Sequence, residues 1–157
     1  MRELTNYDID AFFQRLGNKS YGGCLAKDRL HVETRKYAGL DIRKFYIINM
    51  DNSDGEGTHW VLCSLINKDI GVYFDSFGVS APEEVLTFMR KHRKQNVMNN
   101  NEIQDIDAIT CGYYCCYIGH ELSKGRLFMD IINEFSDRER DNEKAITEWA
   151  EKMGLGQ

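Results

Sequence analysis

The stretch HWVLCSLINKDIGVYFD, residues 59–75, predicts two antiparallel strands joined by a short turn. Both ends are rich in β-branched and aromatic residues, and NKD at 67–69 is typical of a hairpin loop. If these three residues form the loop, Asp75 lies opposite Val61, and His59 becomes a diagonal neighbour of Asp75 on the same face. A two-residue loop would put them on opposite faces. The pairing of His59 with Asp75 therefore depends on an odd loop length.

Around this hairpin, the sequence alternates helical and extended patterns. FYIINM, residues 45–50, predicts a strand buried on both faces, whereas the glycines of YGGCLAKDRL (21–30) and the asparagines of NVMNNNE (96–102) favour loops. This order of elements indicates an α+β fold with a mainly antiparallel central sheet packed by helices. Four helices are expected: one capped by Thr5 and Asp8 and ended by Gly17, one capped by Ser80 and running to about Lys94, one beginning near Cys111, and one from Asp137 to Met153, capped by Ser136 and ended by Gly154.

The composition bounds the class of protein. With 157 residues, 42% of them hydrophobic, and one Pro, the chain is expected to form a single domain over 1–157. A net charge of −5 argues against a surface built throughout for nucleic acid. The polar start MRELTNYDIDAFF does not fit a secretory signal, and no apolar run is long enough to span a membrane. We therefore expect a soluble protein in the virion or the host cell interior that is not secreted, with its five cysteines as free thiols.

A second stretch, QDIDAITCGYYCCY at 104–117, supplies a candidate nucleophile. Cys111 stands at the expected first turn of a helix, where free backbone amides and the helix dipole favour thiolate over thiol. Gly112 would let another chain segment approach closely. Gln104 could offer its side-chain amide to an oxyanion beside Cys111, where one such donor is worth about 3 to 4 kcal/mol. His59, oriented by Asp75, would be a suitable base for the thiol.

These two stretches together resemble the adenovirus-type maturation cysteine proteases (adenain), in the clan of the proteases that act on SUMO and other ubiquitin-like proteins. The resemblance runs from Leu4 to about Leu122 and rests on a His-Trp pair opening a strand, an acidic residue before an x-F-G turn, and a Gln shortly before a Cys-Gly. The small size and the AKD segment look closer to proteases of virophages and Polinton-like elements than to the adenovirus enzymes themselves. The resemblance implies a permuted papain-like architecture, because the order His, Asp, Gln, Cys reverses papain's Cys-first order.

The resemblance also implies roles for the individual residues. Cys111 would be the nucleophile, His59 the general base, Asp75 its orienting partner and Gln104 the oxyanion donor. Trp60 and Gly112 would contact a narrow, Gly-containing substrate, and cleavage would follow small residues, often near Gly-Gly, in viral precursor proteins such as capsid components. The adenovirus enzymes carry Glu where this chain has Asp75. They are also stimulated by DNA and by a peptide that forms a disulfide with a cysteine for which residues 95–103 offer no counterpart, so no disulfide-linked peptide is expected. The acidic balance of the chain weakens the case for DNA, and no cofactor is expected.

Other interpretations of these residues remain open. Cys115 and Cys116 could join Cys111 and His120 in a zinc site, but the spacing lacks a C-x2-C knuckle and no metal is expected. Cys115 fits better as a small core residue. A basic run offers a surface for weak nucleic-acid contact, or it complements the dipole at a helix C-terminus. Its members are Arg90, Lys91, Arg93 and Lys94.

Three rival functions remain, and experiments separate two of them from endopeptidase activity. A ubiquitin-like-protein isopeptidase would be labelled at Cys111 by a diglycine-ending ubiquitin or SUMO probe as readily as by a viral precursor peptide. A same-clan acetyltransferase would transfer acetyl from acetyl-CoA without proteolysis. A noncatalytic interaction module would have no need of His59, Asp75 and Cys111 together.

Overall fold

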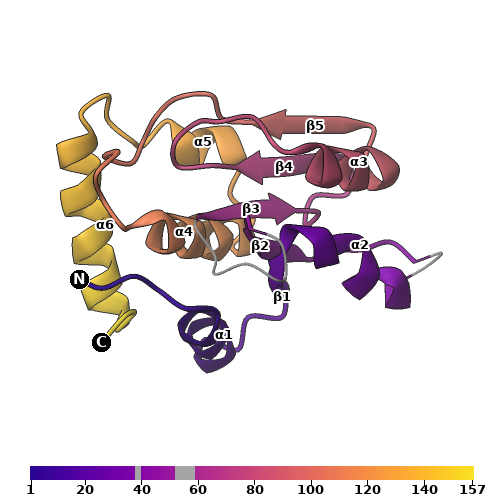
Figure 1. Ribbon diagram of the computed structural model, residues 1–157, viewed down its shortest axis with the longest axis horizontal. Helices are drawn as coiled ribbons and strands as arrows, with labels where there is room; N and C mark the ends of the chain where they lie inside the picture. Colours follow the sequence, from indigo (N-terminus) through magenta and orange to yellow (C-terminus); the bar gives the residue numbers. More distant parts are fainter. Residues whose placement is uncertain (38–39, 52–58) are drawn as a thin grey trace.

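A five-stranded sheet forms the centre of the computed structural model, which describes residues 1–37, 40–51 and 59–157 (Figure 1). Its strands follow one another across the sheet in the order in which they occur in the sequence. Their bounds are β1 Tyr21–Ala26, β2 Phe45–Asn49, β3 Trp60–Ser64, β4 Ile70–Phe74 and β5 Gln95–Met98.

The β3–β4 hairpin has the register that a three-residue loop predicts. Leu62 pairs with Phe74 and Ser64 with Val72. The Asn67 side chain closes the turn by accepting the backbone N–H groups of residues 69 and 70 at 2.8 and 3.1 Å, as Asx turns do. The prediction is confirmed, and the two ends of the hairpin that carry His59 and Asp75 therefore lie together.

The α+β class is confirmed, but the two outer strands were missed by the sequence prediction. β2, β3 and β4 pair antiparallel, whereas β1 pairs in parallel with β2 and β5 in parallel with β4. Glycine weakens a strand pattern, yet it is needed in β1, because a Cβ on Gly22 would lie 2.4 Å from the Tyr46 ring. The Asn-rich β5 forms through backbone pairing with β4, which overrides its low strand propensity.

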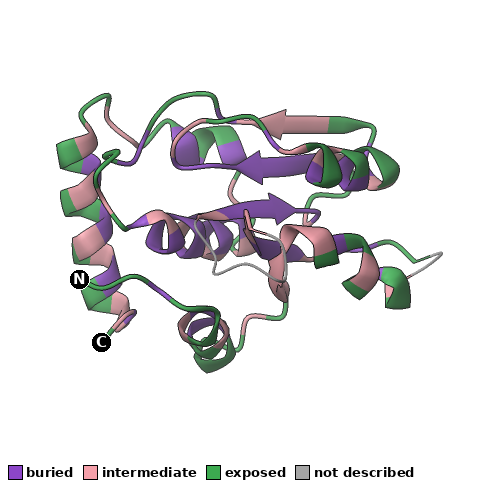
Figure 2. Cartoon of the chain, viewed as in Figure 1, coloured by how far each residue is buried: buried purple, intermediate pink, exposed green. Residues whose placement is uncertain are grey.

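Helices cover both faces of the sheet (Figure 1). Residues of α1, α4, α5 and α6 pack on one face in a cluster that contains Phe45, Leu62 and Phe74, and residues of α2 and α3 pack on the other face around Tyr46 and Tyr73. Figure 2 shows the buried residues on the sheet-facing sides of these elements. The helices are α1 Asn6–Arg15, α2 Leu30–Glu33, α3 Glu83–His92, α4 Cys111–Ser123, α5 Phe128–Ile132 and α6 Glu139–Met153, with 3-10 turns at Lys27–Arg29 and Arg35–Tyr37.

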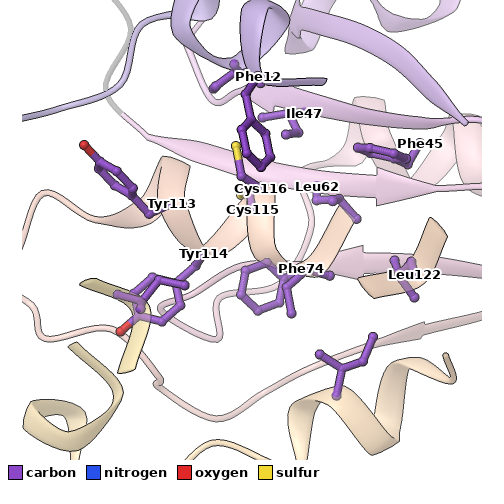
Figure 3. Close-up of a cluster of buried hydrophobic side chains, with 14 of the residues drawn as sticks. Phe12, Phe45, Ile47, Leu62, Phe74, Tyr113, Tyr114, Cys115, Cys116 and Leu122 are labelled. Carbon is purple, nitrogen blue, oxygen red and sulfur yellow. The ribbon is translucent and has the colours of Figure 1, made fainter. Parts of the chain in front are cut away.

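The central helix α4 is apolar on most of its circumference and begins at Cys111, as predicted. Figure 3 shows Cys115 and Cys116 among aromatic side chains such as Phe12 and Phe74, and both thiols are fully buried. Burial raises the pKa of both thiols well above the ordinary value. The interpretation of Cys115 as a core residue is therefore confirmed. Cys111, the first residue of the helix, differs from both because it is only half-buried.

Two predicted helix caps are wrong, α3 ends at His92 rather than at about Lys94, and the short helices α2 and α5 were not predicted. Pro82, in extended conformation, rather than Ser80, stands at the N-cap of α3. The hydroxyl of Ser136 accepts the backbone N–H of Arg138 in a separate turn, so α6 begins at Glu139. The Thr5 capping box and the left-handed Gly154 are present as predicted.

The structure corrects one member of the basic run. Arg93 is 7% exposed, and its guanidinium donates to the carbonyls of Ile42, Leu65 and Asn67 at 2.7 to 2.9 Å. It joins the segment before β2 to the β3–β4 turn and is not available to nucleic acid. Lys94 and its basic neighbours at 90 and 91 are exposed, and nucleic-acid contact stays a prediction for those three.

Replacing Arg93 by Met should lower the free energy of unfolding by about 3 kcal/mol. The reason is that three carbonyl groups, two of them in buried hydrogen bonds, lose their donor at once. The exposed neighbour provides the control, because Lys94→Met should change stability by less than about 0.5 kcal/mol. Urea unfolding of both variants measures this difference, and equal small effects would contradict a structural role for Arg93.

Candidate active site

The predicted site residues are carried to one place by the ends of regular elements. His59 directly precedes β3, Asp75 directly follows β4, Cys111 is the first residue of α4, and Gln104 lies in the loop before it. His59, Gln104 and Cys111 line the same cleft, of about 490 Å³, and Asp75 is buried behind His59. Hairpin register and helix start together produce this convergence.

Asp75 holds the imidazole of His59 through a defined ring nitrogen. Nε2 of His59 lies 2.8 Å from Oδ1 of Asp75. The same Oδ1 accepts the backbone N–H of Phe77 at 2.8 Å, and the side chain of Asn99 bonds both the backbone N–H and the carbonyl of Asp75. The carboxylate is thus held through Oδ1, and Asn99 fixes the main chain that carries it. Because Nε2 faces Asp75, the remaining ring nitrogen, Nδ1, is left for Cys111.

The environment of His59 favours its protonated form. Burial of the ring is the largest effect and lowers the pKa, but hydrogen bonds to Asp75 and then to Cys111 outweigh it, and the pKa of His59 rises to about 9. The ring of Phe77 stacks on the imidazole at 4.9 Å with an interplanar angle of 26°, which suits a cation. An imidazolium beside a thiol stabilises the thiolate.

The raised pKa of His59 predicts a defined dependence of stability on pH. A cation whose pKa rises on folding stabilises the native state fully below its unfolded value, about 6.5, and this contribution is lost as the pH rises through about 9. Asp75→Asn removes the charge that raises this pKa. The parent should therefore exceed the variant in unfolding free energy most at pH 6, and by less at pH 9.5.

Urea unfolding at these two pH values and NMR titration of the His59 ring test this expectation. Asp41→Asn is the control, since Asp41 pairs with Arg43 on the surface and its loss should give a difference that stays nearly constant over this range. A His59 ring that titrates near 6.5 in the parent would contradict the expectation that Asp75 raises its pKa.

Cys111 is half-buried at the start of α4, where the first helical N–H groups have no partner within the helix. The preceding residue, Thr110, is held from behind by α6, because its hydroxyl donates to the carboxylate of Glu143 at 2.7 Å. The hydroxyl of Tyr114 also donates to Glu143. The helix end that carries the thiol is therefore anchored to the C-terminal helix.

The amide of Gln104 is buried and bonded at both of its ends. Oε1 accepts the hydroxyl of Ser76 at 2.6 Å, and Nε2 donates to the carbonyl of Ala108 at 2.8 Å. Sequence reasoning missed Ser76, Phe77 and Asn99. The first two directly follow Asp75, and that adjacency was the available signal. For Asn99, which comes from the loop after β5, the sequence carried none.

Trp60 lines the cleft on the side formed by the N-terminal segment, whereas Gly112 is buried and is not among the residues that line the cleft. The indole N–H of Trp60 donates to the carbonyl of Leu4 at 3.1 Å. A Cβ on Gly112 would lie 3.2 Å from Cβ of Leu4 and from Cδ1 of Trp60. The segment that approaches Gly112 closely is thus residue 4 and its neighbours, which also line the cleft together with Trp60.

Within residues 1–37, 40–51 and 59–157, three or more His, Cys, Asp or Glu side chains nowhere come together in a way that could hold a metal ion. In the same part of the chain, all five cysteines are free thiols. None of the helices described here has the length and apolar character needed to cross a membrane.

Comparison with known proteins supports the architecture. No family model and no curated protein matches the sequence. Among solved structures, the ASFV pS273R protease superimposes with a TM-score of 0.64 at 18% identity, over 89% of this chain and 64% of that one. The selenomethionine form of the same protease superimposes with a TM-score of 0.55 at 20% identity, over 81% of this chain and 60% of that one. The chain thus spans less than two thirds of the length of these proteins.

The C-terminal Ulp1 protease domain in complex with Smt3, the yeast orthologue of SUMO, is a more distant match, with a TM-score of 0.47 at 16% identity over 81% of this chain and 68% of that one. At such identities a likeness establishes the fold and not the activity. The chain has the α+β fold of the ASFV pS273R protease, with a five-stranded sheet packed by helices on both faces.

Proposed function

We propose that this protein is a cysteine endopeptidase in which Cys111, His59 and Asp75 form the catalytic triad. The observation that carries the proposal is the hydrogen bond between His59 Nε2 and Asp75, which leaves Nδ1 for the thiol in the same cleft. The proposal draws further support from a fold shared with a protease and from the resemblance of the His-Trp and Gln…Cys-Gly stretches to the adenovirus-type maturation proteases.

The first half of the reaction forms a thioester. The Cys111 thiolate attacks the scissile carbonyl carbon, and the carbonyl oxygen becomes an oxyanion. The backbone N–H of Cys111 and Nε2–H of Gln104 stabilise this charge. As the tetrahedral intermediate collapses, Nδ1–H of the His59 imidazolium gives its proton to the leaving amine and the C–N bond breaks.

The second half releases the acyl group. Neutral His59 takes a proton from water through Nδ1, and the resulting hydroxide attacks the thioester carbonyl. Collapse of the second tetrahedral intermediate expels Cys111 as a thiolate, and His59 remains protonated beside it. Asp75 keeps its charge throughout and stabilises the imidazolium in both halves.

The proposed substrates are precursor proteins of a virion, cut after small residues and often near Gly-Gly. The resemblance to the maturation proteases supports this substrate class, and the cleft agrees with it. Trp60 and Leu4, joined by a hydrogen bond, border the cleft beside Cys111, and bulky side chains next to the cut would meet this wall. A virophage or Polinton-like element is the proposed source.

Incubation with a proteome-derived peptide library, followed by mass spectrometry of new N-termini, tests the proposal. The parent should generate defined cuts with small residues before the cleaved bond, Cys111→Ala should generate none, and Cys24→Ala should match the parent. Cuts that persist in Cys111→Ala, or a parent that makes no cuts, would refute the endopeptidase proposal. Residue Cys24 is a suitable control because it lies in β1, away from the cleft lining.

A further inference from the structure

We infer that Ser76 is a positioning residue whose hydroxyl sets the orientation of the Gln104 amide and thereby presents Nε2–H to the oxyanion. This inference rests on the proposed function, because it assigns a task within the same reaction. The side chain of Ser76 is fully buried, and its Oγ–H donates to Oε1 of Gln104 at 2.6 Å.

Ser76 also holds the backbone of the loop that carries Gln104. Its carbonyl accepts the N–H groups of Ile103 and Gln104 at 2.8 and 3.0 Å. Ser76 alone therefore bonds both the main chain and the side chain of Gln104. A polar residue with no exposure and three bonds to one loop has little freedom to reorient.

The partners around the amide decide which of its ends faces which neighbour. The carbonyl of Ala108, 2.8 Å from Nε2, can only accept a hydrogen bond. A reversed Gln104 amide would bring two oxygens to that distance, which is repulsive. Nε2 must therefore face Ala108, so Oε1 faces Ser76 and the hydroxyl donates to it. Nε2 has a second N–H, and this one is left for a ligand in the cleft.

The position of Ser76 in the chain links the two halves of the site. Its neighbour Asp75 bonds the imidazole of His59, and Phe77 stacks on the same ring. The turn is tightened by Gly78, at φ +73°, whose N–H bonds the carbonyl of Asp75. Base and oxyanion donor are thus supported by consecutive residues of one turn, which fixes their separation.

Loss of the Ser76 hydroxyl should weaken transition-state stabilisation without lowering the reactivity of the Cys111 thiol. Removal of an oxyanion donor costs about 10² to 10³ in kcat, and Gln104→Ala should show a loss of this size. In Ser76→Ala, the glutamine keeps its bond to Ala108 but loses the one that orders Oε1. We expect a loss of about tenfold in kcat with KM nearly unchanged, smaller than the loss in Gln104→Ala.

Two reagents that react with Cys111 distinguish a loss of Gln104 positioning from a general disruption of the site. A peptide aldehyde, made from the best-cleaved library peptide, forms an S–C bond with Cys111 and places a tetrahedral oxygen where the oxyanion donors act. Iodoacetamide alkylates the same sulfur at a saturated carbon, with loss of iodide, and forms no oxyanion. Ser76→Ala should weaken aldehyde affinity about tenfold and leave the alkylation rate within about twofold of the parent.

Ser64→Ala is the matched control, because Ser64 is also a buried hydroxyl, but it bonds the backbone of Ile66 at the far end of β3. It should change neither measurement. Ser76→Thr and Ser76→Val have the same shape, so any strain from the added methyl is shared and only Ser76→Thr should retain aldehyde affinity. This pair decides the question even if Ser76→Ala folds poorly.

A double-mutant cycle completes the test. Once Gln104 is replaced by Ala, a further Ser76→Ala substitution should not weaken aldehyde binding any more. Full aldehyde affinity in Ser76→Ala, additive losses, or equal affinities in the Thr and Val variants would overturn the inference and leave the proposed function intact. Aldehyde binding that is unaffected by Cys111→Ala would instead refute the endopeptidase proposal.

Discussion

Replacing Cys111 by Ala should lower kcat by at least about 10⁴-fold, and replacing His59 by Ala should lower it by a similar factor. In the proposed mechanism the two residues act as one thiolate–imidazolium pair, so each depends on the other for its reactive state. Without the sulfur no thioester forms, and without the imidazole the thiol lacks both its cationic partner and the acid that protonates the leaving amine.

Because the pair acts as a unit, the losses should not multiply. The double variant Cys111→Ala, His59→Ala should retain about the same residual rate as either single variant. Single-turnover cleavage of the best library peptide measures all three. His92→Ala, on the far end of α3, is the control and should match the parent. Full additivity, or a His59→Ala variant with normal kcat, would contradict the triad.

The hairpin and α4 could be predicted from sequence because their signals are local. An odd loop and a buried apolar pattern decide the register of β3 and β4, and that register alone brings His59 and Asp75 together. Cys111 follows from the helix start. The outer strands could not be predicted this way, since β1 and β5 depend on parallel pairing with distant partners and their glycines and asparagines suggest loops.

The supporting contacts of the site were harder to predict for the same reason. Ser76 and Phe77 are next to Asp75 in sequence, but their partners lie in the loop before α4 and before β3. Asn99 and Glu143 reach the site from the end of β5 and from α6. Such contacts between distant segments are fixed only when the sheet and both helix layers are assembled.

Asp75→Asn should retain far more activity than Asp75→Ala. In the parent, Oδ1 of Asp75 accepts two N–H groups, from the His59 ring and from the backbone of Phe77. The side chain of an asparagine here would turn its oxygen toward both donors, because its NH₂ group cannot accept from either. The imidazole would keep its tautomer with Nδ1 toward Cys111, and only the negative charge would be lost.

We therefore expect a loss of about tenfold for Asp75→Asn and a larger one of about 10³-fold for Asp75→Ala, the latter within the range that general acid–base catalysis supplies. The loss in Asp75→Asn should also grow with pH, because Asp75 helps to raise the pKa of His59 to about 9 and its neutral replacement would release the proton earlier. Profiles of kcat/KM from pH 6 to 9.5 measure both effects. Equal losses in the two variants would mean that the orientation of the ring depends on the charge of Asp75. They would contradict the expectation that the asparagine oxygen accepts from both the His59 ring and the Phe77 backbone.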